Sequence, residues 1–133
     1  MTNFLPVLDQ AVSRTGQPTA SARGATRHFL HHATHIRAPA RPESADVVLL
    51  VVAELVTNAI RYTDGPCTLH LELHEDHVEI RVTDTSRHPP TPRPPHTDGT
   101  GGWGWQLINQ LTTHTHIEPT PTGGKTIHAH IPW

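Results

Sequence analysis

The sequence contains little that would crosslink the chain or hold it in a membrane. A single cysteine, Cys67, excludes a disulfide within the chain and favours a reducing compartment. The longest apolar run, residues 47–53, is much shorter than the roughly 20 residues that a membrane-spanning helix needs. The first residues lack the basic segment and the following apolar segment of a secretory signal. We therefore expect a cytoplasmic protein that is not embedded in a membrane.

The chain also lacks an excess of positive charge. Its 10 Lys and Arg residues are balanced by 12 Asp and Glu residues, which gives a net charge of −2 and a pI near 6.7. A protein that binds nucleic acid directly usually carries a basic surface, so this composition argues against such a role. The length of 133 residues is typical of one domain, and we expect a single domain over residues 1–133.

Histidine, by contrast, is abundant, with 13 residues. Many of them repeat at short spacing, as in the groups His31, His32 and His35; His70, His74 and His77; His114 and His116; His128 and His130. No HExxH motif, zinc-finger spacing or thiolate partner accompanies these groups. We interpret the abundance of histidine as a compositional bias, in which histidines replace Arg and Lys at exposed positions, and not as a metal site.

Hydrophobic periodicity predicts an α+β fold. Apolar residues at helical spacing indicate helices over residues 18–34, from 43 or 44 to about 63, and after the glycines that precede residue 105. Alternating polar and apolar residues indicate strands at 67–74, 77–84, 113–118 and 125–131, with a further strand possible within 4–14. The order favours a two-layer sandwich, with a mainly antiparallel mixed sheet and the helices on one face.

Two polar residues interrupt the most apolar helix. Glu54 and Asn58 lie one helical turn apart, so their side chains share one face. A carboxylate and an amide oxygen on one face suit a hard cation such as Mg²⁺, or a water held for chemistry. The structural alternative is that Glu54 pairs with Arg61 or Arg81 and that Asn58 caps a turn.

Two further features accompany this pair. Asp84 lies where a predicted strand ends, and the proline-rich segment 85–101 that follows has no periodicity and almost no apolar residues. The glycine cluster within residues 99–104 then precedes a predicted helix, where backbone N–H groups and the helix dipole favour a phosphate. Taken separately, the aspartate is typical of a turn cap and the glycines of a flexible linker.

In their order along the chain, these segments resemble the ATP-binding domains of the GHKL superfamily, which have the Bergerat fold. ELVTNAIRY at 54–62 is similar to the N box of that superfamily, VTDTSRHPP at 82–90 to the G1 box and GTGGWGWQLI at 99–108 to the G2 box. GGKTIHAHI at 123–131 is similar to the last strand segment. Within the superfamily, the chain looks most like the small anti-sigma-factor serine kinases and their stand-alone actinobacterial relatives.

The resemblance implies a role for each matched residue. Asn58 would coordinate the Mg²⁺ that bridges the ATP phosphates, and Glu54 would be the general base that activates the attacking hydroxyl. Asp84 would accept a hydrogen bond from the adenine amino group. Residues 85–101 would form the ATP lid. Further ATP contacts are implied for Ser86, Gly99, Gly101, Gly102, Trp103, Gly104 and, through water beneath the base, Thr126.

Some residues depart from the family pattern. Ser86 stands where the G1 box has a glycine, and Trp103 stands where smaller aliphatic residues are usual. Thr100 stands where some active kinases have a basic residue that meets the γ-phosphate. Arg87, Arg93 and Lys125 are the candidates to replace that residue.

The resemblance also implies partners. We expect an ATP-dependent kinase that phosphorylates a serine of an anti-anti-sigma (STAS-type) protein and binds a sigma factor. A homodimer is expected too, with Phe29, Leu30 and Ile36 as a candidate surface. The alternatives are a nucleotide-binding switch that sequesters a partner without phosphotransfer, and a scaffold that no longer holds ATP.

Overall fold

The computed structural model describes residues 6–13, 15–62, 65–85 and 104–133, without the side chains of Tyr62 and residues 104–107. Most of the predicted ATP lid and five of the predicted ATP contacts therefore lie outside the described residues. These five are Ser86, Gly99, Gly101, Gly102 and Trp103. Glu54, Asn58, Asp84 and Thr126 are described, as is the backbone of Gly104.

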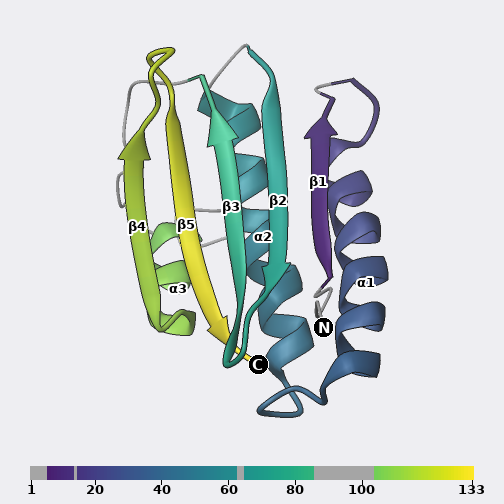
Figure 1. Cartoon of the computed structure of the whole chain (residues 1–133). Helices are drawn as coiled ribbons and strands as arrows, with labels where there is room; N and C mark the ends of the chain where they lie inside the picture. Colours follow the sequence, from purple (N-terminus) through teal and green to yellow (C-terminus); the bar gives the residue numbers. More distant parts are fainter. Residues whose placement is uncertain (1–5, 14, 63–64, 86–103) are drawn as a thin grey trace, which may run out of the picture.

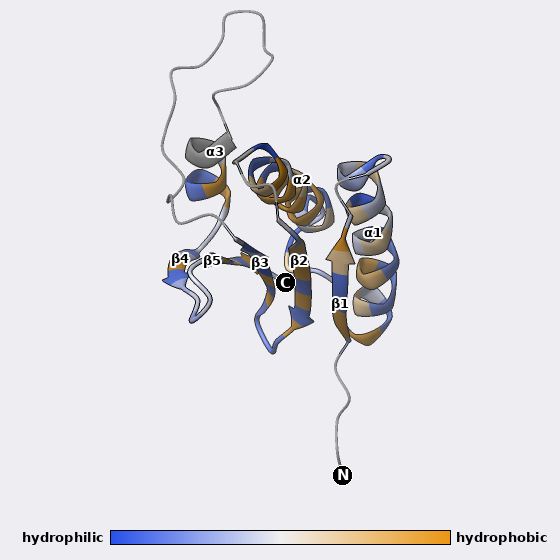
Figure 2. Cartoon of the chain, turned by 90° about the horizontal axis from the view of Figure 1, so that it is seen from above, coloured by the Kyte–Doolittle hydropathy of each residue, from blue (hydrophilic) through white to orange (hydrophobic). Residues whose placement is uncertain are grey.

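The described chain folds into two layers, a five-stranded sheet and three helices (Figure 1). The elements follow in the order β1 (Val7–Val12), α1 (Pro18–Ile36), α2 (Ser44–Tyr62), β2 (Cys67–Leu73), β3 (His77–Asp84), α3 (Gly104–Leu111), β4 (His114–Pro119) and β5 (Lys125–Pro132). The strand order across the sheet is β1-β2-β3-β5-β4, and each neighbouring pair is antiparallel. All three helices lie on the same face of the sheet (Figure 2), so the predicted α+β sandwich is confirmed.

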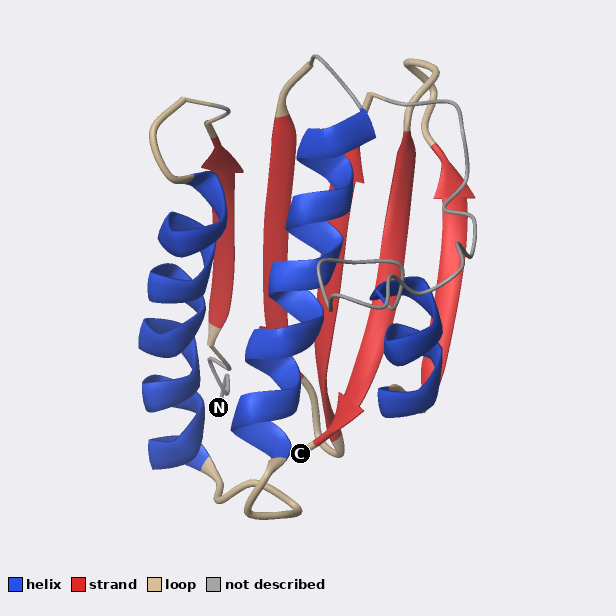
Figure 3. Cartoon of the chain, turned by 180° about the vertical axis from the view of Figure 1, so that it is seen from behind, coloured by secondary structure: helices blue, strands red, loops and turns tan. Residues whose placement is uncertain are grey.

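The core fills the space between the sheet and α2. Alternate residues of the central strands point toward the helices and are buried, among them Leu69, Leu71, Ile80 and Ile131. α2 crosses the middle of the sheet (Figure 3) and buries Val48, Val51, Val52, Leu55 and Val56 against it. Each such side chain contributes roughly 1.5–3 kcal/mol when it leaves water. This packing explains why the helix is nearly all apolar, and it fixes the position of the two polar residues within it.

Glycines make two of the turns. Gly16, between β1 and α1, has φ +76°, and Gly123, between β4 and β5, has φ +93°. This backbone region favours glycine because other residues carry a Cβ that clashes there. Pro18 follows the turn at Gly16 and opens the first turn of α1, where the predicted helix over residues 18–34 begins. No helix in the described part of the chain combines the length and the apolarity needed to cross a bilayer.

Candidate functional site

Glu54 and Asn58 lie on the flank of α2 that is turned toward α3. Val47, seven residues before Glu54 and so on the same face, lines a cavity together with Leu111 of α3. The opposite flank, with Leu49 and Ala53, faces α1. Both polar side chains are half-buried, and neither has a hydrogen bond or an ion pair with another described residue. A carboxylate and an amide are thus presented together beside α3 with their polar atoms available.

The predicted alternative, in which Glu54 pairs with Arg81, is wrong. Arg81 alternates along β3 with the buried Ile80 and Val82, so it points to the sheet face that the helices do not cover. There its Nη2 lies 3.2 Å from Glu72 Oε2 and its Nε lies 2.9 Å from Glu79 Oε1. The sheet therefore separates the guanidinium from Glu54.

Asp84 ends β3 on the helix-facing side of the sheet and is buried, with 5% of its surface exposed. Its carboxylate binds Lys125, the first residue of β5. The Lys125 Nζ atom lies 3.0 Å from one carboxylate oxygen and 2.7 Å from the other. Because the two residues are direct cross-strand partners, the sheet register itself places the ammonium on the carboxylate.

The backbone around Asp84 is closely packed against Gly124. A Cβ atom on Gly124 would lie 2.0 Å from the Asp84 carbonyl oxygen and 2.9 Å from Thr85 Cα. Neither backbone atom can move aside without disturbing β3, so only glycine fits at this position. The GG pair that precedes β5 therefore holds the start of that strand against the end of β3.

Thr126 is not brought to Asp84. Successive residues of a strand point to opposite faces, so Lys125 faces the helices and Thr126 faces away from them. On that outer face Thr126 hydrogen-bonds Thr83. Lys125 is thus the residue of this segment that lies beside Asp84, at the position expected to bind the adenine base. The sequence motifs did not predict Lys125 at this position. The signal was available, because the alternation that buries Asp84 also buries its cross-strand partner.

Cys67 lies near the same pair, at the start of β2. Burial and the negative charge of Asp84 raise the pKa of its thiol to about 11, and the positive charge of Lys125 acts in the opposite direction. The ends of three strands thus meet here around one carboxylate, one ammonium and one neutral thiol.

The N-terminus of α3 points toward this end of the sheet. α3 ends at Leu111, and the backbone N–H of Thr113 donates to the His130 carbonyl, near the far end of β5. Gly104, the first residue of α3, is therefore directed toward the Lys125 end. Helix N-termini offer unsatisfied N–H groups and a positive dipole, which suits a phosphate.

The sequence matches the model of a known protein family. The model of the histidine kinase-like ATPase domain matches residues 17–129. The chain belongs to this family. A chain in the crystal structure of the SiaB–SiaC complex from Pseudomonas aeruginosa shares the fold, with a TM-score of 0.64 and 14% sequence identity over 96% of this chain and 91% of that chain. No curated protein matches the chain significantly. ATP is accordingly the ligand that the family implies.

The outer face of this ATPase domain carries most of the short-spaced histidines, and they interleave with carboxylates. His70, Glu72 and Glu79 place ligand atoms within 4.8 Å of one another, a spacing that could hold a metal ion. Both glutamates, however, already bind the Arg81 guanidinium. We therefore explain this cluster as an ion-pair network that neutralises the glutamates.

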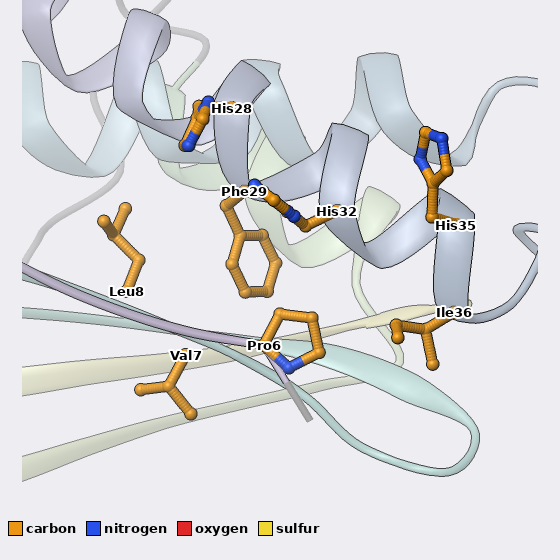
Figure 4. A pocket seen from close by; sticks show the side chains of 8 residues that line it. All are labelled: Pro6, Val7, Leu8, His28, Phe29, His32, His35 and Ile36. Carbon is orange, nitrogen blue, oxygen red and sulfur yellow. The ribbon is translucent and has the colours of Figure 1, made fainter. Parts of the chain in front are cut away.

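A cavity of about 500 Å³ lies between β1 and α1 of the ATPase domain (Figure 4). Phe29 points from α1 toward Pro6 in its wall. Phe29 and Leu30 are each only 4% exposed, whereas Ile36 is 55% exposed. The predicted dimer surface is therefore corrected, because two of its three residues belong to the core.

Proposed function

We propose that this chain is a Mg-ATP-dependent protein serine kinase of the anti-sigma-factor type. It would phosphorylate a serine of an anti-anti-sigma (STAS-type) partner and control a sigma factor in the cytoplasm. The observation that carries the proposal is the pair Glu54 and Asn58, which lies beside α3 without a described partner. A purely structural helix this apolar would gain nothing from two half-buried polar groups that are not paired.

The donor set of the pair fits the proposed chemistry. The Asn58 amide oxygen is the kind of ligand that Mg²⁺ accepts, alongside phosphate oxygens and water. A Mg²⁺ ion held by Asn58 would supply neutralisation of the phosphate charge. Asp84 would orient the base at the other end of the site, by accepting a hydrogen bond from the adenine amino group.

In the transfer step, Glu54 would take the proton of the substrate serine hydroxyl. The serine oxygen forms a bond to the γ-phosphorus while the bond to the β,γ-bridging oxygen breaks. The products are phosphoserine and ADP, and the proton stays on Glu54 until it passes to solvent. The α3 N-terminus, which begins at Gly104, would hold phosphate oxygens through its backbone N–H groups.

The test is Mg-ATP binding by wild type, Asp84→Asn and Glu54→Gln. Asp84→Asn should lose affinity because the amide cannot accept as the carboxylate does. Glu54→Gln should bind ATP like wild type and lose phosphotransfer. The proposal would fail if wild type bound no adenine nucleotide.

A second candidate function is a nucleotide-binding switch that sequesters a partner without phosphotransfer. It is favoured by the ion pair of Lys125 with Asp84, since this contact holds the lysine beside the residue proposed to bind adenine and away from the γ-phosphate. Single-turnover incubation with labelled ATP and a STAS-type protein distinguishes the two functions. Stable binding of both ligands without label transfer would select the switch.

We also propose a homodimer that forms along the β1 edge of the sheet. Among the described strands, β1 pairs only with β2, which leaves its other edge open. Val7 is 53% exposed and Ile36 is 55% exposed next to the cavity between β1 and α1. Ile36→Glu should convert a dimer to a monomer in light scattering, whereas Leu50→Glu on α2, another exposed apolar position, should not.

A further inference from the structure

The carboxylate of Asp84, the residue proposed to bind the adenine base, has Lys125 beside it. Lys125 Nζ lies within 3.0 Å of both of its oxygens, and the two side chains are only 9% and 3% exposed. An ionised carboxylate can only accept hydrogen bonds, whereas an ammonium has three N–H donors. One acceptor group and one donor group are therefore presented side by side in a buried setting.

A lone carboxylate would select strongly for adenine. Adenine has an amino group at position 6, which donates to a carboxylate. Hypoxanthine and guanine have an oxygen there, which would face the carboxylate with no hydrogen between them. In a buried site, two acceptors that face each other without a hydrogen bond raise the free energy of binding. Such sites therefore discriminate sharply between adenine and 6-oxopurines.

We propose that Lys125 lets this site accept a 6-oxopurine nucleoside triphosphate as well as ATP. The inference rests on the proposed contact between Asp84 and the base. With ATP, the 6-amino group donates to Asp84 and N1 accepts from Lys125. With a 6-oxopurine, O6 accepts from Lys125 and the N1–H donates to Asp84. Both bases then find a partner for each polar atom on this edge, after a small shift of the base.

The four-carbon stem of lysine makes this exchange possible. Two of the ammonium hydrogens suffice for the two Asp84 contacts, and no other described residue accepts from Nζ. A third donor is thus available to the base without loss of the ion pair. A shorter side chain, such as threonine, could not reach across the carboxylate in this way.

The competing explanation is that Lys125 only neutralises Asp84 and ties β5 to β3. In that case its removal lowers stability, and it weakens the binding of all nucleotides to a similar extent. The ratio of affinities for two bases would not change. That ratio therefore separates a role in specificity from a structural role.

The experiment uses ATP and ITP, which differ only at position 6 and in the hydrogen on N1. Their Kd values are measured with Mg²⁺ for wild type, Lys125→Met and Lys125→Arg. Methionine keeps an unbranched side chain of similar length and removes the charge and the donors, while arginine keeps the charge and the donors. Wild type should bind the two nucleotides with Kd values within about tenfold of each other. Lys125→Met should raise the preference for ATP at least tenfold, and Lys125→Arg should keep the wild-type ratio.

Each outcome decides one question. A wild-type protein that binds neither nucleotide overturns the proposed function itself. A wild-type protein that binds ATP but prefers it to ITP by more than a hundredfold overturns only the role of Lys125, even if the methionine variant does not fold. An equal ATP-to-ITP ratio in wild type and a folded Lys125→Met variant overturns that role as well.

Discussion

The hydroxyl oxygens of Thr83 and Thr126 lie 2.9 Å apart and hydrogen-bond across β3 and β5, on the sheet face away from the helices. The neighbouring cross-strand pair, Asp84 and Lys125, faces the helices. One step along the two strands thus separates a solvent-side contact from the candidate base site.

Thr126→Val should lower the free energy of unfolding by about 1 kcal/mol, because it removes one partner of this hydrogen bond. ATP affinity should stay within about twofold of wild type, since the hydroxyl does not share a face with Asp84. Urea denaturation and nucleotide titration measure the two quantities. Thr126→Ser, which keeps the hydroxyl, is the control. A large loss of ATP affinity in the valine variant alone would restore the role that the resemblance implies for Thr126.

Asn58→Ala should weaken ATP binding at least about tenfold in the presence of Mg²⁺ and much less in EDTA, because the lost amide oxygen acts through the cation. Thr57→Val is a matched control on the same turn, since Thr57 is directed toward Thr19 of α1, which it hydrogen-bonds. Calorimetric titrations with and without EDTA provide the comparison. Equal losses under the two conditions would exclude a magnesium ligand.

Gly124→Ala should be strongly destabilising, by more than about 2 kcal/mol, because the new Cβ would meet the Asp84 carbonyl oxygen at 2.0 Å. Gly24 provides the opposite case within the same protein. It lies in α1 with nothing within 4 Å of an added Cβ, so Gly24→Ala should stabilise the fold by about 0.5–1 kcal/mol. Thermal or urea unfolding of both variants measures these opposite changes in stability. A Gly124→Ala variant as stable as wild type would contradict the close approach of β5 to β3.

The protein should be less stable in mild acid, because His130, on the sheet face away from the helices, becomes protonated there. Burial and neighbouring His77 lower the pKa of His130 below its ordinary value of 6.5, although Glu79 acts against this. The unfolded chain then binds a proton more readily than the native state. Stability is therefore full above about pH 6.5 and falls as the pH decreases from there toward the lower native pKa.

His130→Asn should reduce the slope of unfolding free energy against pH between about pH 7 and 5. His32→Asn, at an exposed position of α1, is the control for the effect of a histidine-to-asparagine substitution itself. At still lower pH, Glu79 contributes a further loss. Burial would raise the pKa of Glu79, but the positive charge of Arg81 and the hydrogen bond with His130 outweigh burial and lower it. Identical slopes in wild type and His130→Asn would contradict the assignment.

The thiol of Cys67 should react slowly with iodoacetamide in the native protein at pH 8, because burial and Asp84 raise its pKa to about 11. Asp84→Asn removes the second of these causes and should bring the pKa down. Alkylation rates across pH, followed by mass spectrometry, measure both proteins. Full reactivity in urea confirms that the thiol itself is intact. A native rate equal to the unfolded rate would contradict the burial of this cysteine.

Periodicity was sufficient to predict most of the fold. The alternation in residues 67–74 and 77–84 predicted β2 and β3, and the apolar run before Glu54 predicted α2. These patterns are local, since a strand or a helix shows its buried face within a few residues. The differences are confined to element ends, such as α1, which continues to Ile36 instead of residue 34.

The site was predicted less completely, for a reason that lies in the register. Glu54 and Asn58 could be paired from their spacing along one helix. The contact of Asp84 with Lys125 spans 41 positions of sequence and depends on how β5 aligns with β3. Similarly, the short spacing of His128 and His130 is visible in the sequence, but their cross-strand partners Glu79 and Arg81 are not. Such neighbours across strands follow from the sheet order, which the local pattern does not contain.

The strand order has a consequence for how the protein is made. β5 is synthesised after the other four described strands, yet it lies between β3 and β4 in the sheet. While residues 125–132 are still held by the ribosome, β3 lacks a neighbour along one side and Asp84 lacks Lys125. Such long-range pairing forms slowly, because distant parts of the chain must meet first. We therefore expect the nascent chain to gain affinity for nucleotide only after residues 125–132 have left the ribosome, and chaperones that cover open strand edges to act before that point.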